Sequence, residues 1–148
     1  MRWASYLLMI VLFSCSPYSG LRRQAFQYTN DNQHHTIRIV VPKGYSRSHS
    51  GVDSVGNQTL FYYFPNGALL YFARLSGNTE IHPFDTTNNI PRQHPLGGVI
   101  YKGMNEKGLF WREIRIRSFR FGYRNVSSEQ ELAFDSATNS ASILKPVD

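Results

Sequence analysis

The chain has 148 residues, of which 41% are hydrophobic, so it has the size and composition of one globular domain with short additional segments. Aromatic residues make up 14% of the chain, most of them Tyr and Phe, and this share favours strands over helices. The formal net charge is +6, but no nucleic-acid-binding motif accompanies it, so we expect no nucleic-acid partner.

The first fifteen residues have the features of an export leader. Met1-Arg2 is a short positive start, and the run from Trp3 to Phe13 is almost wholly apolar but too short for a stable membrane span. The run ends at Leu12-Phe13-Ser14-Cys15, which resembles a bacterial lipobox, and Cys15 is the only cysteine. The resemblance implies that Cys15 carries a diacylglycerol and becomes the mature N-terminus. An ordinary secretory leader and a membrane-lying N-terminal helix are the alternatives.

This interpretation divides the chain into three parts. Residues 1–14 would be a lipoprotein signal peptide, residues 15–32 a lipidated Cys15 followed by a flexible polar tether, and residues 33–148 a single α+β domain. Two or three acyl chains hold a protein stably on a membrane, where a single chain does not. No acidic run follows Cys15, so we expect a cell-envelope protein anchored to the outer membrane and facing the periplasm.

Alternating and apolar runs predict the strands of the domain. His35 to Pro42 reads as a strand that stops at Pro42 and the turn residues Lys43-Gly44. Thr59–Phe64 and Ala68–Arg74 flank Pro65-Asn66-Gly67, which predicts a central hairpin because Asn-Gly supplies the positive φ angles of a tight turn. Gly98 to Lys102 reads as a further short strand. The segments 45–58 and 75–97 show no period and are interpreted as long loops.

The strongest strand signal begins after Gly108. Phe110, Ile114 and Ile116 share one parity, whereas Phe119, Phe121 and Tyr123 share the opposite parity. A strand of period two cannot switch faces without an extra residue, so we predict a bulge or sharp bend near Arg117-Ser118.

A single helix is predicted after this strand, from about Glu129 to Ser140. Ser128 and Glu131 have capping-box spacing, and Phe134, Ala137 and Ala141 repeat at helical spacing. The predicted fold is therefore α+β, with an antiparallel sheet of about five to six strands and one C-terminal helix packed on it.

The order of these elements resembles the C-terminal half of PsbP-like α/β/α sandwich domains, whose relatives include photosystem extrinsic subunits. The resemblance rests on the Pro42-Lys43-Gly44 turn, the hairpin, the basic-aromatic strand, and a capped helix with Phe134-Asp135-Ser136 and a closing Ile143. It implies an accessory or binding role, and it transfers no site residues.

Arginine is the best candidate for a ligand-binding residue. Twelve of the sixteen basic residues are Arg, and the candidate ligand-binding set is Trp111, Arg115, Arg117, Arg120 and Arg124. By parity, Trp111, Arg115 and Arg117 share one face of their strand, and Arg120 and Arg124 lie on the non-aromatic face beyond the bend. Guanidinium groups bind carboxylate, sulfate or phosphate through paired hydrogen bonds, and Trp can stack on a sugar ring or a cation. The alternative is a solvated sheet face whose arginine stems cover apolar surface. Arg112 shares the apolar parity, so we expect it to form an ion pair with Asp135 or Glu131.

Signatures of catalysis and of metal binding are weak. The histidines His34, His35, His49, His82 and His94 with Asp85 could supply ligands from the loops, but no pair has helical i, i+4 spacing, and we expect no metal and no cofactor. No nucleophile elbow or phosphate-binding glycine loop is present, so no catalytic residue is assigned. We therefore expect a non-enzymatic envelope lipoprotein that binds a protein or an anionic glycan. The alternative is a hydrolase with its site in the loops 45–58 and 75–97.

Overall fold

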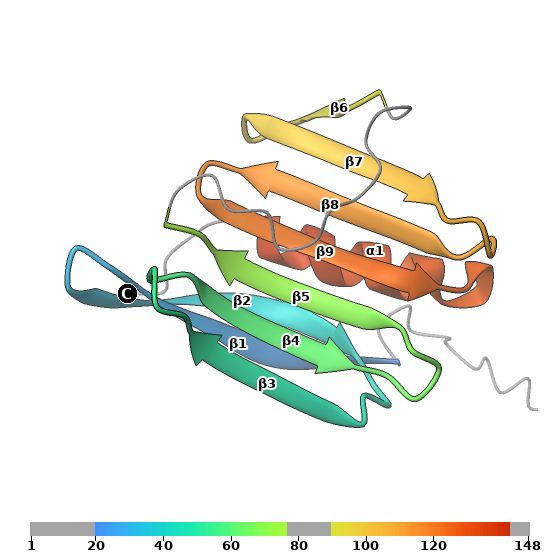
Figure 1. Ribbon diagram of the computed structural model, residues 1–148, viewed down its shortest axis with the longest axis horizontal. Helices are drawn as coiled ribbons and strands as arrows, with labels where there is room; N and C mark the ends of the chain where they lie inside the picture. The colour runs from blue at the N-terminus through green and yellow to red at the C-terminus, as the bar shows by residue number, and fades with distance from the viewer. Residues whose placement is uncertain (1–19, 77–89, 143–148) are drawn as a thin grey trace, which may run out of the picture.

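The computed structural model describes residues 20–76 and 90–142, so the lipobox-like pattern and Cys15 lie outside the described residues. Figure 1 shows the elements in chain order. They are β1 Leu21–Asn30, β2 Gln33–Pro42, β3 Arg47–Val52, β4 Gln58–Tyr63, β5 Leu69–Arg74, β6 Arg92–His94, β7 Gly98–Met104, β8 Phe110–Ile116, β9 Phe119–Val126 and α1 Ser128–Ser142.

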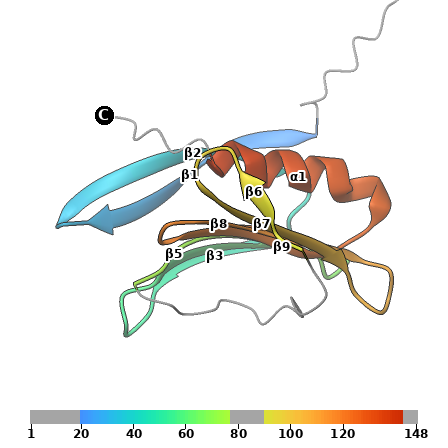
Figure 2. The same cartoon turned by 90° about the horizontal axis from the view of Figure 1, so that it is seen from above.

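The elements form two layers. Seven strands make one antiparallel sheet in the order β3-β4-β5-β9-β8-β7-β6, and β1 pairs with β2 in a separate two-stranded ribbon. Figure 2 shows α1 and this ribbon side by side on one face of the large sheet. The Val40 amide donates a hydrogen bond of 2.9 Å to Ser140 Oγ, which joins the ribbon to the helix. The expected α+β class with an antiparallel sheet and a C-terminal helix is confirmed.

The core lies between the two layers. The ribbon contributes Ile37, Ile39 and Val41, each at most 2% exposed, and α1 contributes the stripe of Phe134, Ala137 and Ala141. This stripe was predicted from helical spacing and is confirmed. The ring of Phe134 lies 4.9 Å from that of Phe64 and 5.6 Å from that of Tyr123, measured between centroids. The face of the large sheet that meets the ribbon and α1 contributes Phe72, Ile114 and Phe121 to the same core.

The flexible tether predicted over residues 15–32 is wrong for residues 21–30, which form β1. Phe26 pairs with Ile37 of β2 and is 2% exposed, so burial of this ring holds the strand in place. The hairpin turns through Asp31 and Asn32, whose φ angles are 48° and 61°. Asp and Asn tolerate positive φ, which lets this pair replace the more familiar Asn-Gly.

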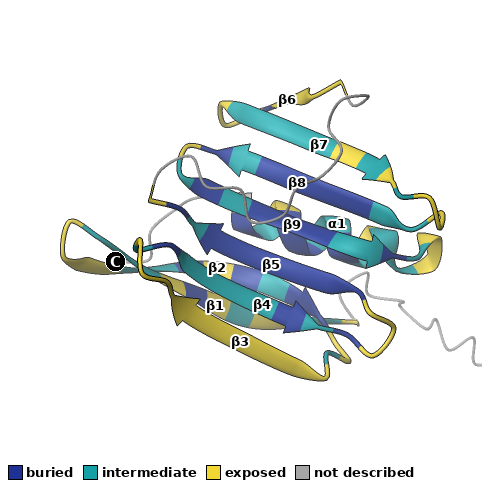
Figure 3. Cartoon of the chain, viewed as in Figure 1, coloured by how far each residue is buried: buried dark blue, intermediate teal, exposed yellow. Residues whose placement is uncertain are grey.

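The predicted count of five to six strands is also wrong, because the described residues contain nine strands in two sheets. Two of the missed strands lie at the sheet edges inside segments interpreted as loops: β3 within 45–58 and β6 within 75–97. All residues of β3 are exposed, as Figure 3 shows, so β3 carries no alternation of buried and exposed side chains.

The predicted bend at Arg117-Ser118 is a complete reversal of the chain. Ile116 pairs with Phe119, so Arg117 and Ser118 are the two central residues of a tight hairpin that joins β8 to β9. The φ angle of Arg117 is 52°, as two-residue hairpin turns require at their first central position. The reversal explains the change of parity, because Ile116 and Phe119 face the same layer from neighbouring strands.

The helix begins one residue earlier than predicted. Ser127 precedes it, and its hydroxyl lies 3.3 Å from Gln130 Oε1, while the Gln130 amide donates to the Ser127 carbonyl. The predicted capping pair of Ser128 and Glu131 is therefore wrong by one position. Ser127 and Gln130, which have the same i, i+3 spacing, make these contacts instead. Glu131 on α1 instead forms an ion pair with Lys102 on β7.

Candidate binding face of the sheet

The face of the large sheet that points away from α1 carries four arginines and many of the aromatic residues. We call it the arginine–aromatic face. It consists of Arg47, Phe61, Tyr63, Tyr71, Tyr101, Trp111, Arg115, Arg120 and Arg124.

Strand pairing brings four of the five predicted ligand-binding residues onto this face. Trp111 and Arg115 come from β8, and Arg115 is the direct cross-strand partner of Arg120 on β9. Arg124 follows Arg120 at strand spacing on the same side. Arg117 is separated from them, because it lies exposed in the β8–β9 turn. The prediction that Arg117 shares a strand face with Arg115 is therefore wrong.

One row of side chains crosses this face from the sheet edge to the middle. Arg47 pairs with Tyr63, Tyr63 with Leu69, and Leu69 with Arg124. The guanidinium carbon of Arg47 lies 4.3 Å from the centroid of the Tyr63 ring, which is a cation–π distance. Sequence reasoning missed Arg47 and Tyr63, because the strand that carries Arg47 was interpreted as a loop.

Trp111 lies on β8 at the point where the ladder between β8 and β9 is irregular. The pairing shifts between Phe110 and Arg112, and Asn125 on β9 has a φ angle of 57°. Such a bulge re-aims neighbouring side chains. The Trp111 ring lies against Gly103, where an added Cβ would come within 2.8 Å of it, and Trp111 is only 7% exposed. Trp111 is therefore a buried part of the arginine–aromatic face.

Glu113 is a buried carboxylate in the middle of the arginine–aromatic face. Its Oε2 accepts a hydrogen bond of 2.6 Å from the Tyr71 hydroxyl, and its Oε1 lies 2.5 Å from Arg115 Nε. Arg115 also stacks over Tyr101 at 4.7 Å, so Arg115 is held by two neighbours. Glu113 has the parity of Trp111 and Arg115, and this signal was available in the sequence.

Arg120 and Arg124 differ in the hydrogen-bond acceptors that the protein supplies for their guanidinium groups. The Nη1 atom of Arg120 donates to the carbonyls of Arg117 and Phe119, at 2.9 and 2.8 Å, and so closes the turn. The Nε atom of Arg124 is buried and has no hydrogen-bond partner among the residues that the structure describes. A buried donor without an acceptor costs about 1–3 kcal/mol, so this atom needs an explanation.

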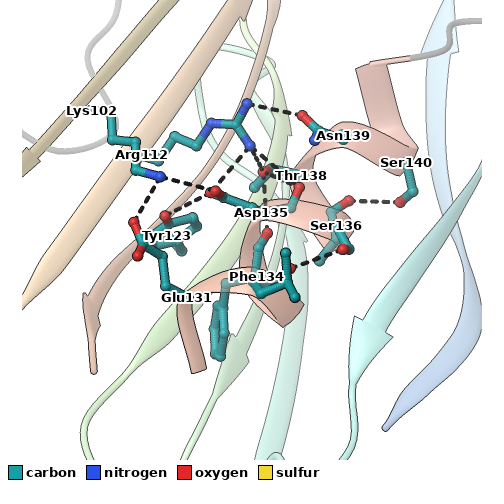
Figure 4. Close-up of polar contacts among 12 residues, drawn as sticks. Lys102, Arg112, Tyr123, Glu131, Phe134, Asp135, Ser136, Thr138, Asn139 and Ser140 are labelled. Atoms are coloured by element: carbon teal, nitrogen blue, oxygen red, sulfur yellow. Dashed lines mark hydrogen bonds and ion pairs between the residues drawn. The ribbon is translucent and has the colours of Figure 1, made fainter. Parts of the chain in front are cut away.

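A second polar cluster lies on the opposite side of the sheet, beneath α1 (Figure 4). Arg112 is 7% exposed, and its Nη1 lies 3.3 Å from Asp135 Oδ1, so the predicted pairing with Asp135 is confirmed. Its guanidinium also donates to Thr138 Oγ1 and Asn139 Oδ1, both at 2.9 Å. Asp135 therefore anchors a buried cation to the helix.

Asp135 has two further partners. The Tyr123 hydroxyl donates to Asp135 Oδ1 at 2.8 Å, and Lys102 Nζ lies 2.9 Å from Asp135 Oδ2. Burial, followed by the hydrogen bond to Asp135 and its charge, raises the pKa of Tyr123 well above its ordinary value of 10. Desolvation lowers the pKa of Lys102, but the carboxylates of Glu131 and Asp135 raise it more, and the net shift is upward.

We expect the protein to lose stability steeply above pH 10. Burial raises the pKa of Tyr62 to about 12, and it raises the pKa values of Tyr71 and Tyr123 as well. The folded state thus keeps protons that the unfolded chain releases near pH 10, so the stabilisation is complete below pH 10 and is lost as the pH rises. Each proton contributes at most about 1.4 kcal/mol per pH unit. Denaturant titrations at several pH values should show this decline, and Tyr62→Phe should make it shallower; a decline of unchanged steepness would contradict the assignment.

Asp53, one of the carboxylates available to the hydrolase alternative, is used within its own turn. Its Oδ1 accepts from the amides of Val55 and Asn57, and its Oδ2 accepts from Asn57 Nδ2, at 2.8–3.0 Å. Desolvation raises the pKa of Asp53, but these hydrogen bonds lower it more, so the group titrates below its ordinary value of 3.8. Glu80 and Asp85 lie outside the described residues.

The described residues contain no group of three His, Cys, Asp or Glu side chains that could hold a metal ion, while His82 and Asp85 lie outside them. Within 20–76 and 90–142, no helix has the length and apolarity needed to cross a membrane. The site and the two-layer fold together describe an α+β domain with a basic-aromatic sheet face. No known family, curated protein or solved structure matches the chain.

Proposed function

We propose that the protein is a non-enzymatic, membrane-anchored lipoprotein of the cell envelope. Its arginine–aromatic face would act as a binding or accessory module for an anionic glycan or for an acidic region of an envelope protein. The PsbP-like resemblance is part of this proposal, and the packing of a C-terminal helix on an antiparallel sheet supports it. Such a module needs no catalytic group.

The observation that carries the proposal is the row from Arg47 to Arg124. Two guanidinium groups flank Tyr63 and Leu69, and neither guanidinium forms an ion pair with a residue that the structure describes. Arg124 Nε also lacks an acceptor within residues 20–76 and 90–142. Carboxylate oxygens would supply acceptors, and Tyr63 offers a ring against which a sugar or an apolar stem can pack.

Binding to acidic polymers should depend on Arg47 and Arg124. We expect the double variant Arg47→Gln/Arg124→Gln to bind immobilised polygalacturonate or polyglutamate at least about tenfold more weakly, since two charge-assisted contacts would be lost. Wild-type binding should weaken as salt is raised. Surface plasmon resonance at two salt concentrations measures both effects.

A matched control is Arg22→Gln/Arg38→Gln, which removes the same charge from the ribbon on the other layer. This control should bind within about twofold of wild type, because only the local charge should matter. Equal weakening in both double variants would mean that net charge alone drives binding, and the proposed face would be abandoned. Comparison of the two polymers distinguishes a glycan ligand from an acidic protein segment.

The membrane anchor is proposed from the lipobox-like Leu12-Phe13-Ser14-Cys15. Intact mass spectrometry of protein extracted from membranes of the native host should give a chain that starts at Cys15 and carries two or three acyl chains. Cys15→Ser should release the protein from the membrane fraction. An unmodified thiol on a freely soluble species would contradict both the anchor and the envelope location.

A further inference from the structure

A separate hollow lies on the α1 side of the sheet, where β6 and β7 extend beyond the helix. Its volume is about 340 Å³, within the range of small-molecule sites. It is lined by Ile90, Arg92, Ile100, Lys102, Arg112 and Asp135. The arginine–aromatic face is on the other side of the sheet, so the two sites do not share side chains.

Strand register explains why three cations meet here. Arg92 pairs with Ile100 across β6 and β7, and Lys102, two residues after Ile100, pairs with Arg112 across β7 and β8. Side chains two residues apart on one strand share a face, so all three cations lie on the face that meets α1. Asp135 enters the same hollow from the helix.

The three cations are not equally neutralised. Arg112 is held by acceptors on α1, and Lys102 Nζ lies between Glu131 and Asp135, at 2.7 and 2.9 Å. Arg92 is exposed and pairs with no carboxylate among the residues that the structure describes. Three cations against two carboxylates leave one positive charge, and Arg92 is the group that can turn toward a ligand.

The surroundings of the hollow favour a ligand with one negative charge and an apolar part. Ile90 and Ile100 supply apolar surface beside the guanidinium of Arg92, and Ile90 is 92% exposed. Burial and the charge of Arg112 lower the pKa of the neighbouring His94, which agrees with a positive potential in this corner. A bound carboxylate would complete the charge balance that Glu131 and Asp135 leave unfinished.

We propose that this hollow is a second binding site, for a small aliphatic monocarboxylate. The carboxylate would accept hydrogen bonds from the Arg92 guanidinium, and the aliphatic chain would lie against Ile100 and Ile90. This site is independent of the proposed function, because it needs neither the membrane anchor nor the arginine–aromatic face.

Isothermal titration calorimetry of the domain with sodium hexanoate tests the site. Saturable binding is expected for hexanoate, with at least tenfold weaker binding of uncharged hexanamide and of acetate, which lack the charge and the chain length respectively. Arg92→Gln should weaken hexanoate binding at least tenfold. Arg22→Gln, which removes an exposed charge from the ribbon, should leave it within twofold.

The Arg92→Gln variant should fold normally because Arg92 is exposed, which a circular dichroism spectrum would verify. Absence of saturable hexanoate binding, or equal binding by wild type and Arg92→Gln, would overturn the proposal. Arg47→Gln/Arg124→Gln should keep hexanoate binding, and a loss there would also overturn it. Failure of the polymer-binding experiment leaves these expectations unchanged, so the two sites can fail separately.

Discussion

Replacing Asp135 by Ala is expected to lower the free energy of unfolding by about 3 kcal/mol, because it leaves the buried Arg112 charge without its carboxylate. Asp135 also accepts from the Tyr123 hydroxyl and pairs with Lys102. Loss of the carboxylate thus removes three contacts between α1 and the sheet. Chemical denaturation of both proteins at pH 7 measures the difference.

The Arg112→Met variant is the informative comparison. It removes the buried cation but leaves Asp135 paired with Lys102 and Tyr123, so we expect a smaller loss of about 1 kcal/mol. Glu131→Gln removes one of the two carboxylates that pair with Lys102 but leaves every contact of Asp135, so it should cost at most about 0.5 kcal/mol. If Arg112→Met were as destabilising as Asp135→Ala, Asp135 would not be the anchor of the cluster.

Replacing Gly122 by Ala should destabilise the protein by about 3 kcal/mol, at the upper end of what overpacking costs. An added Cβ would lie 2.3 Å from the Tyr71 hydroxyl oxygen and 2.5 Å from the Arg112 carbonyl oxygen. Tyr71 would have to move and would lose its hydrogen bond to the buried Glu113. Thermal and denaturant unfolding should both report the loss.

Gly20→Ala is the matched control for Gly122→Ala, because no heavy atom of the described residues lies within 4 Å of a Cβ built at Gly20. Its stability should stay within about 0.5 kcal/mol of wild type. Tyr71→Phe/Gly122→Ala tests the mechanism further. It removes the hydroxyl that meets the new Cβ, but the contacts with the ring carbon Cζ and with the Arg112 carbonyl oxygen remain, so the double variant should regain only part of the lost stability. A stable Gly122→Ala single variant would mean that Tyr71 does not lie across Gly122.

Sequence patterns predicted the elements whose burial alternates or repeats. The central hairpin of β4 and β5 is confirmed, and its turn closes with hydrogen bonds between Phe64 and Ala68 and from Gly67 to Phe64. The stripe on α1 and the pairing of Arg112 with Asp135 followed from parity and helical spacing. These features were accessible because each depends on residues that repeat along one element.

Edge strands and unusual turns could not be predicted from such repeats. Every residue of β3 is exposed, so β3 has no burial pattern to read. The β1–β2 hairpin turns through Asp31 and Asn32, and Arg117 takes the positive φ angle that glycine would normally take. At Arg117 the pairing of β8 with β9 overrides the local preference of the turn residue, whereas Asp31 and Asn32 tolerate positive φ themselves.

The candidate site was predicted in part. Parity on β8 and β9 identified Trp111, Arg115, Arg120 and Arg124, which the structure places on one face. It could not identify Arg47 or Tyr63, because their place in the row depends on the order of strands in the sheet. The role of Glu113 depends likewise on Tyr71, which comes from β5.

The side-chain resonance of Arg124 provides the most direct test of the proposed binding face. In nitrogen–proton NMR spectra, adding a galacturonate oligosaccharide should shift the guanidinium N–H signals of Arg124 progressively to saturation, as this partly exposed side chain gains an acceptor. The corresponding signals of Arg38, on the ribbon, should stay in place. A signal from Arg124 that does not move while the oligosaccharide binds would show that the acidic ligand is held elsewhere.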